Sequence, residues 1–187
     1  MTAVNQQERL GRLNLNEMNE EIQSLLTLFT KDADLHYFLS GFIDGEGSFS
    51  VAIIKHPTQR WGWMINPCFQ VYQHKKHREV LELCKYVFKS GAIYRKSGIH
   101  PVLNYSINSQ KDIKERVIPF FDRYPLVTKK ENYEKFRYIV NAMEHKQHLK
   151  PKGFCELVDI AYSMNQQGKG RKRTKEEIFS SVQEISV

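Results

Sequence analysis

The sequence has few cysteines and no long apolar run, and outside its N-terminal segment acidic residues are outnumbered by basic ones. Its three cysteines, Cys68, Cys84 and Cys155, are far apart and odd in number. That pattern predicts free thiols in a reducing compartment and argues against a disulfide framework or a cysteine-based zinc site. No apolar stretch is long enough to span a bilayer, and the N-terminal MTAVNQQERL is too polar for a secretory signal. We therefore expect an intracellular protein that does not enter a membrane.

The charge of the chain is unevenly distributed. The 187 residues carry a net charge of +7, but residues 1–34 contain three basic and six acidic residues, a balance of −3. The remaining residues therefore carry the difference, +10. A basic body of this kind favours a nucleic acid as partner, with an anionic membrane surface as the weaker option. Charge alone fits a merely soluble basic protein equally well.

The hydrophobic pattern divides the chain into an N-terminal helical extension, residues 1–34, and a main domain, residues 35–187. A short amphipathic helix is predicted in the extension because four apolar residues have helical spacing. These four residues are Ile22, Leu25, Leu26 and Phe29.

The main domain alternates between helical and strand periodicity. A helix is expected from about Leu35 to Ile43, with Asp34 as its N-cap. Alternating apolar residues then predict two strands, a helix, two further strands and several helices. Pro67 interrupts the second strand, so a bulge or an edge position is expected there. The order predicts an α+β fold in which helices cover one face of a sheet and the other face is bare.

The bare sheet face is predicted to present hydrogen-bonding side chains and almost no acids. A twisted β-ribbon fits the major groove of DNA and reads base edges there, so we interpret this face as a DNA-reading surface. A solvated sheet face is the commoner case. The residues assigned to the surface are Ser50, Ala52, Ile54, Asn66, Cys68, Gln70, Tyr72, Tyr94, Lys96, Asn104, Ser106 and Asn108.

Two basic segments are interpreted as phosphate contacts. One is GKGRKR, residues 168–173, a glycine-containing stretch expected to neutralise phosphates without reading sequence. The alternative is a mobile solvated loop. A capping-box pattern from Thr174 to Glu177 then opens a last short helix. The basic residues concerned are Lys169, Arg171, Lys172 and Arg173 in this segment, and Lys75 and Lys76 after the second strand.

The stretch LSGFIDGEGSF, residues 39–49, ends a helix in two acids and three glycines and passes at once into a strand. Gly41 and Gly45 lie on one side of that helix, where the missing Cβ atoms allow a second helix to approach closely. The second helix belongs either to the same chain or to a second copy. For a second copy, the interface residues are Phe38, Gly41, Phe42 and Gly45.

The two acids of this stretch have different expected roles. Asp44 is expected to form hydrogen bonds at the helix end. Glu46 lies at a helix C-terminus, where the helix dipole disfavours an anion, so its carboxylate requires a cation. Carboxylate and carbonyl oxygens suit Mg²⁺, which also takes phosphate oxygens as ligands. Two copies of Glu46 side by side would hold metal ions for in-line attack on a phosphodiester.

The nonapeptide LSGFIDGEG, residues 39–47, resembles the LAGLIDADG signature of homing endonucleases. It departs from that signature at Ser40, Phe42, Gly45 and Glu46. The resemblance covers about residues 35–177 and is strongest to single-motif members encoded by group I introns in large-subunit ribosomal RNA genes, through FQVYQH and FKSGAIYRKSG. It implies an αββαββα fold with a saddle-shaped antiparallel sheet and extra C-terminal helices. A single motif implies a homodimer on a palindromic or nearly palindromic DNA site.

The resemblance also implies an activity, which is site-specific cleavage of both DNA strands to initiate intron homing. Mg²⁺ is the implied cofactor, with Mn²⁺ as a substitute and Ca²⁺ supporting binding without cleavage. The retained acid favours an active nuclease over an RNA maturase or a non-cleaving DNA-binding protein on the same fold. An unrelated basic α+β binding module is the remaining alternative. Chloroplast, mitochondrion and bacterial cytoplasm all fit as compartments.

The resemblance assigns roles to individual residues. Glu46 and the carbonyl of Gly45 correspond to metal ligands, and Gln73 to a residue that positions solvent at the scissile phosphate. His77 stands where the family has a basic residue, with Lys75, Lys76 and Arg78 as alternatives. Lys130 corresponds to a lysine that steadies charge at the phosphate, and Lys129 is the alternative.

Overall fold

The computed structural model describes residues 15–96, 101–165 and 171–186. The elements of the first half are α2 (Leu15–Leu26), α3 (Asp32–Glu46), β1 (Gly47–Lys55), β2 (Trp63–His74), η1 (Lys75–His77), α4 (Arg78–Phe88), β3 (Ala92–Arg95) and β4 (Val102–Ile107). Those of the second half are α5 (Gln110–Asp112), η2 (Ile113–Val117), α6 (Ile118–Arg123), α7 (Lys130–Glu144), η3 (Gln147–Leu149), α8 (Pro151–Ser163) and α9 (Lys175–Ser186). The order confirms the predicted α+β arrangement, and none of the described helices is long and apolar enough to cross a membrane.

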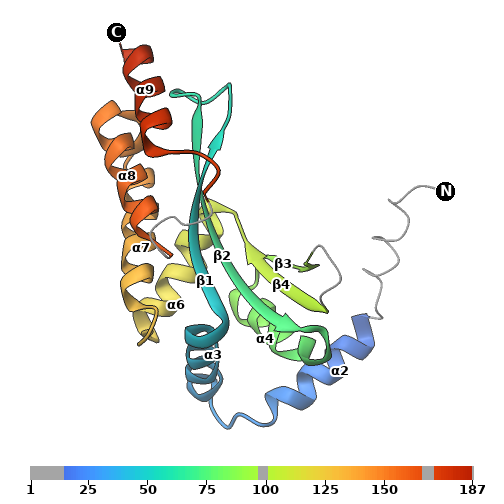
Figure 1. Ribbon diagram of the computed structural model, residues 1–187. Helices are drawn as coiled ribbons and strands as arrows, with labels where there is room; N and C mark the ends of the chain where they lie inside the picture. Colours follow the sequence, from blue (N-terminus) through green and yellow to red (C-terminus); the bar gives the residue numbers. More distant parts are fainter. Residues whose placement is uncertain (1–14, 97–100, 166–170, 187) are drawn as a thin grey trace, which may run out of the picture.

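The four strands form one antiparallel sheet in the order β1-β2-β4-β3. β1 pairs with β2 along its full length, from Gly47 opposite Val71 to Lys55 opposite Trp63. β4 pairs only with the second half of β2, starting at Phe69. The β1–β2 hairpin therefore extends beyond β4, and it runs beside α8 and α9 in Figure 1.

Helices cover one face of this sheet, as expected. Along β2 every second residue from Trp63 to Val71 is buried while the residues between them are partly exposed. The buried side chains meet an aromatic cluster in which the ring of Phe49 lies 5.3 Å from Phe69, 5.2 Å from Phe121 and 5.5 Å from Phe136 between ring centroids. Each fully buried ring of this size stabilises the fold by about 1.5–3 kcal/mol relative to exposure.

Helix α3 is longer than the sequence indicated, because it begins at Asp32 and continues through Glu46. The prediction that Asp34 caps this helix is wrong. Lys31 is the N-cap, and Asp34 occupies the third helical position, where its carboxylate accepts the Lys31 backbone N–H at 3.2 Å. An acid in the first turn also interacts favourably with the positive end of the helix dipole.

The bulge expected at Pro67 is absent from the β1–β2 ladder, which runs without interruption through the pair Val51–Pro67. The carbonyl of Val51 points away from β2, since it accepts a hydrogen bond from Arg171 on the outer side of β1. This pair is therefore a non-hydrogen-bonded one, in which β1 requires no N–H from its partner. On the other side of β2, pairing with β4 starts only at Phe69, so Pro67 has no β4 partner. On that side Pro67 therefore has the edge position that was expected.

The C-terminal segment covers the outer edge of β1. The Asn165 side chain donates to the carbonyl of Phe49 at 2.7 Å, and the Arg171 guanidinium donates to the carbonyl of Val51 at 3.0 Å. These two carbonyls are the outward-facing acceptors of an edge strand. An exposed edge is a template for unwanted strand pairing, and the two side chains occupy it.

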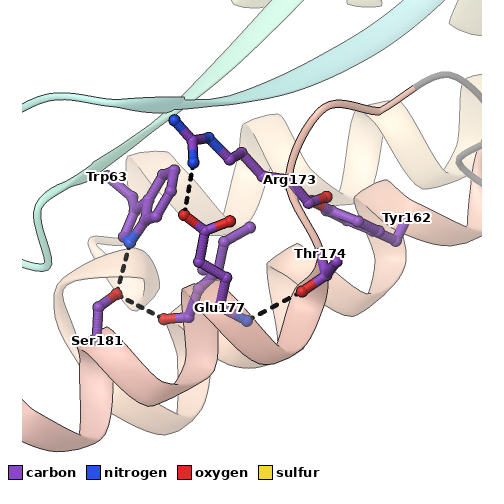
Figure 2. A network of polar contacts seen from close by, with 7 residues as sticks. Trp63, Tyr162, Arg173, Thr174, Glu177 and Ser181 are labelled. Atoms are coloured by element: carbon purple, nitrogen blue, oxygen red, sulfur yellow. Dashed lines mark hydrogen bonds and ion pairs between the residues drawn. The ribbon is translucent and has the colours of Figure 1, made fainter.

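Helix α9 binds the tip of the β1–β2 hairpin through a hydrogen bond, as Figure 2 shows. The Trp63 indole N–H donates to Ser181 at 2.6 Å, and the Thr174 hydroxyl accepts the backbone N–H of Glu177 at 3.2 Å. Thr174 is thus the predicted N-cap, but the Glu177 carboxylate pairs with Arg173 at 2.8 Å instead of completing the capping box. The Trp63 side chain is buried here, with only 4% of its surface exposed.

Replacement of Gly47 by alanine is expected to lower the free energy of unfolding by about 2 kcal/mol. A Cβ atom there would lie 2.5 Å from Cγ2 and 2.6 Å from the carbonyl oxygen of Ile43, so the junction between α3 and β1 would have to shift. Urea denaturation measures the loss. Ser48→Ala, at the neighbouring half-exposed position, is the control. Equal stability of Gly47→Ala and the wild type would show that the junction is looser than described.

Candidate active site

Helix α3 presents three distinct faces. Leu35, Leu39 and Ile43 are 3%, 0% and 0% exposed and pack into the core. A second face is polar and contacts the connection between α6 and α7. The third face carries Gly41 and Gly45, and the space above both glycines is open, with no atom within 4 Å of an added Cβ.

The open face of α3 contains the residues predicted for dimer contact. Phe38 and Tyr37 are 44% and 61% exposed, which is unusual for large side chains. Gly41 and Gly45 continue this stripe along the helix, and Phe42 is only partly buried. Of the two alternatives for the glycines, packing against another helix of the same chain is therefore wrong within the described residues.

The polar face of α3 binds the loop between α6 and α7 through residues spaced four apart. His36 Nδ1 lies 3.1 Å from the Tyr124 hydroxyl, and the Ser40 hydroxyl donates to the Tyr124 carbonyl at 2.9 Å. Asp44 binds the far end of the same loop, at Thr128 and Lys129. Residues at this spacing share one side of a helix. The loop therefore lies along α3 from its middle to its C-terminal end.

Asp44 has the structural role expected from its position. Its carboxylate accepts the backbone N–H groups of Thr128 at 2.8 Å and Lys129 at 2.9 Å, just before α7 begins. Burial raises the pKa of Asp44, but the hydrogen bonds from Thr128 and Lys129 outweigh it and hold the pKa below its ordinary value. Asp44 is therefore ionised at neutral pH and anchors the segment that leads into α7.

The two candidate lysines lie in different environments. The Lys129 ammonium donates to the carbonyl oxygens of Asp44 at 2.6 Å and Gly45 at 2.8 Å, at the C-terminal end of α3. Carbonyls of a last helical turn are without intrahelical partners and attract cations. Lys130 points elsewhere, because its ammonium lies 3.9 Å from Glu134 and is 69% exposed. Lys129 is thus the lysine adjacent to the motif.

Glu46 is the exposed last residue of α3, directly before the first residue of β1. Gly47 pairs with Val71, so Gln73, two residues farther along β2, lies beside the end of α3. The basic residues Lys75, Lys76 and His77 follow in η1 and are all exposed. Arg78, an alternative to His77, instead pairs with Glu82 at 2.8 Å.

The end of α3 fits part of a divalent metal site. Its donors are the exposed Glu46 carboxylate and the Gly45 carbonyl, which already accepts one cation, the Lys129 ammonium. Such oxygen donors suit Mg²⁺. The described residues contain no group of three or more histidine, cysteine or acidic side chains that would hold a metal. One chain therefore offers an incomplete set of ligands.

The bare face of the sheet begins beside Glu46. Neighbouring strands bring together Ser50 with Cys68, Ala52 with Asn66 and Ile54 with Met64. Tyr72 pairs with Asn104, which pairs with Tyr94 on the other side. The strand sequences contain no aspartate or glutamate, so the face is free of acids as predicted.

Side chains on this face also bind one another. The Tyr72 hydroxyl donates to Gln70 at 3.0 Å, and the Lys96 ammonium lies 5.3 Å from the centroid of the Tyr72 ring. Ser106 is only 6% exposed, less than expected, because it donates to Asn108 at 2.9 Å beside Cys68. Burial raises the pKa of the Cys68 thiol, so this group is neutral.

The basic segment after α8 is not a uniform set of free cations. Lys169 lies outside the described residues. Arg171 is bound internally, since its guanidinium donates to Val51 and Ala161 and stacks 4.3 Å from the Tyr162 ring centroid. Lys172 and Arg173 are exposed. Arg171 thus has an internal binding role that a charge pattern does not reveal.

Three contacts of the site were missed by reasoning from the sequence. They are the Ser40 hydrogen bond to Tyr124, the capture of Lys129 by the end of α3, and the Asn165 contact with β1. Ser40 replaces an alanine of the signature, so the added hydroxyl was the available signal. The other two depend on residues more than 80 positions apart.

The fold and the site together define an αββαββα protein whose exposed acid lies where a bare, acid-free sheet face begins. A family model described as LAGLIDADG endonuclease matches residues 39–140. The protein belongs to the LAGLIDADG endonuclease family.

Individual relatives agree with this assignment. "DNA endonuclease I-CeuI" of Chlamydomonas moewusii is 39% identical over 87 residues, covering 46% of this chain and 40% of that protein. "Homing endonuclease I-ApeII" of Aeropyrum pernix is 30% identical over 154 residues, covering 79% and 90%. The solved structure "Archaeal Intron-encoded Homing Endonuclease I-Vdi141I Complexed With DNA" superposes with a TM-score of 0.76 at 28% identity, covering 83% and 99%. The chain spans 24% to 40% of the length of I-CeuI and two fungal relatives.

Arg171→Met is expected to lower the free energy of unfolding by about 2 kcal/mol, because two carbonyls lose a charged donor. Lys172→Met, at the neighbouring exposed position, is expected to change it by less than about 0.5 kcal/mol. Urea denaturation of the two variants provides the comparison. If the two variants had equal free energies of unfolding and only Arg171→Met bound DNA more weakly, Arg171 would be a DNA-binding residue and not an internal one.

Proposed function

We propose that this protein is an intron-encoded homing endonuclease that cuts both strands of a long, nearly palindromic DNA site as a homodimer with Mg²⁺. The observation that carries the proposal is the position of Glu46, exposed between the open face of α3 and the acid-free sheet face. An acid at this place has no structural partner among the described residues and lies where DNA on the sheet would pass. Its relatives are named DNA endonuclease and homing endonuclease.

DNA is the partner that best fits the bare face. The four strands present amides, hydroxyls and tyrosines without acids, on a body carrying most of the positive charge. Phosphates of duplex DNA attract such a body, and base edges in the major groove pair with amide side chains. The similar structure of I-Vdi141I was solved with DNA bound. We propose that the protein acts wherever its intron resides, in an organelle or a bacterial cytoplasm.

A second copy of the chain would complete the site. Gly41 and Gly45 leave open space on α3, beside the exposed Phe38. Packing two such helices together would cover the exposed aromatic rings and bring the two copies of Glu46 close to each other. Two carboxylates, helix-end carbonyls and DNA phosphates would then supply the ligands that one chain lacks. A C2 dimer of this kind reads a two-fold symmetric site.

The residues near the metal site have separate proposed roles. Glu46 and the Gly45 carbonyl would hold Mg²⁺, and a bound Mg²⁺ would neutralise charge at the phosphate and lower the pKa of the attacking water. The Lys129 ammonium, which also binds the Asp44 carbonyl, would place a positive charge beside the scissile phosphate. Gln73 orients solvent from the adjacent strand end. His77, Lys75 and Lys76 are close in sequence to Gln73 and exposed, and we propose that His77 assists with the DNA backbone.

Glu46→Gln is expected to abolish Mg²⁺-dependent cleavage while DNA binding in Ca²⁺ stays within about three-fold of the wild type, because only a metal ligand is lost. Cleavage of duplexes selected from a random pool identifies the site, and a gel-shift assay on that site measures binding. Mn²⁺ should support cutting by the wild type. Cutting by Glu46→Gln at the wild-type rate would overturn the assignment of Glu46, and absence of cutting by the wild type would favour the maturase or binding-protein alternative.

Lys129→Met is expected to lower the single-turnover cleavage rate by about 100-fold, because a fixed charge near the phosphate is lost. The matched variant Lys130→Met tests the alternative alignment and is expected to lower the rate by less than about five-fold. Both variants remove the charge and keep most of the length of the side chain. A larger loss for Lys130→Met than for Lys129→Met would show that Lys130 moves into the site when DNA binds.

Gly41→Leu is expected to convert the dimer to a monomer, because the new side chain would occupy the space in which the second helix packs. Sedimentation velocity at several protein concentrations measures the change. Tyr86→Leu, at an exposed position on α4, is the control. An unchanged sedimentation coefficient for Gly41→Leu, or a monomeric wild type, would exclude α3 as the dimer contact.

A further inference from the structure

We propose that Asp44 is a positioning residue that acts on cleavage through Lys129, in addition to anchoring the loop before α7. The inference rests on the proposed function only in its kinetic consequence. Asp44 and Lys129 are 85 positions apart, and all of the contacts between them form at the C-terminal end of α3. Through them a residue that touches neither DNA nor metal determines where a catalytic ammonium lies.

Asp44 holds Lys129 at both ends of its side chain. The carboxylate accepts the Lys129 backbone N–H at 2.9 Å, and the backbone carbonyl of Asp44 accepts the ammonium at 2.6 Å. The preceding residue is fixed as well, because Thr128 donates its N–H to the carboxylate at 2.8 Å and its hydroxyl to the Asp44 carbonyl at 3.0 Å. With backbone and ammonium both bound, few rotamers of this long side chain remain.

Anchoring of the loop alone does not account for this arrangement. The carboxylate already fixes the loop through the backbone N–H groups of Thr128 and Lys129. The ammonium adds nothing to those two bonds, yet it is bound to the backbone carbonyls of Asp44 and Gly45. A flexible lysine loses more rotamer entropy on ordering than most side chains, so holding its backbone in advance reduces the cost of placing its charge.

Ser40 offers a matched control. It lies one turn before Asp44 on the same face of α3, is 4% exposed, and donates to the Tyr124 carbonyl at the other end of the same loop. Ser40→Ala therefore loosens the loop without touching Lys129. Asp44→Asn keeps the shape of the side chain but places an amide against a backbone N–H group. Comparison of Ser40→Ala with Asp44→Asn therefore separates the effect of a looser loop from the effect of a displaced Lys129.

The kinetic test is a double-mutant cycle on single-turnover cleavage. Asp44→Asn is expected to slow cleavage by about 10- to 100-fold at saturating protein, with DNA affinity within about three-fold of wild type. Ser40→Ala is expected to stay within about two-fold of the wild-type rate. Combined with Lys129→Met, Asp44→Asn should slow cleavage little further, because both changes remove the same interaction. Multiplicative losses in the double variant, or equal losses in Asp44→Asn and Ser40→Ala, would overturn the proposal.

A second measurement does not depend on cleavage. Reductive methylation of the folded protein, read by peptide mass spectrometry, reports how freely the Lys129 amine reacts. Lys129 is expected to react several-fold faster in Asp44→Asn than in the wild type, because its backbone is no longer fixed by a carboxylate. The exposed Lys130 is expected to react equally in both proteins. An unchanged Lys129 rate would overturn the proposal even if the enzyme cuts. A changed rate in a protein that cuts no DNA would leave the positioning intact and remove the proposed function.

Discussion

The hydrogen bonds between α3 and the loop before α7 are the interaction on which the rest of the site depends. His36, Ser40 and Asp44 bind that loop along one side of the helix, while Leu35, Leu39 and Ile43 bind the core along another. Because two sides of α3 are occupied in this way, its rotation about its own axis is fixed. The third side, with Gly41 and Gly45, is then necessarily turned outward. Among these bonds, those of Asp44 bring Lys129 to the end of the helix.

The sheet meets a related constraint, since the proposed DNA-reading face has to stay bare without making the sheet unstable. Helices bury its other face around the aromatic cluster of Phe49, Phe69 and Phe121. The outer edge of β1 is covered by Asn165 and Arg171, and the tip of the hairpin is held by the contact of Trp63 with Ser181. Stability therefore comes from the covered face and the edges, and the open face is left to amides and hydroxyls.

The two halves of the proposed site have different degrees of completeness. Lys129 is already held at the Asp44 carbonyl and at the Gly45 carbonyl that would receive a metal, so the single chain satisfies its own helix end. Glu46 has no such partner among the described residues and gains one only from metal, DNA or a second chain. In the proposed dimer, open glycines beside an unpartnered acid would link dimerisation to metal binding, since the same helix would supply both. A monomer of this fold would be stable as a sheet and incomplete as a nuclease.

The sequence by itself determined the order of elements, the acid-free sheet face, the α3 signature and the free thiols, because these follow from periodicity and residue type within short windows. It also indicated that Asp44 is structural and Glu46 is not. Tertiary structure decided which lysine lies at the motif, which arginine is withdrawn into the fold and where α3 ends. Lys129 and Lys130 are adjacent and identical in chemistry, and only the path of the loop along α3 separates them. In the sequence Arg171 is one more positive charge. Only the fold places it against the carbonyl of Val51 at the edge of β1, 120 positions away. Contacts of such separation depend on packing, which local sequence does not encode.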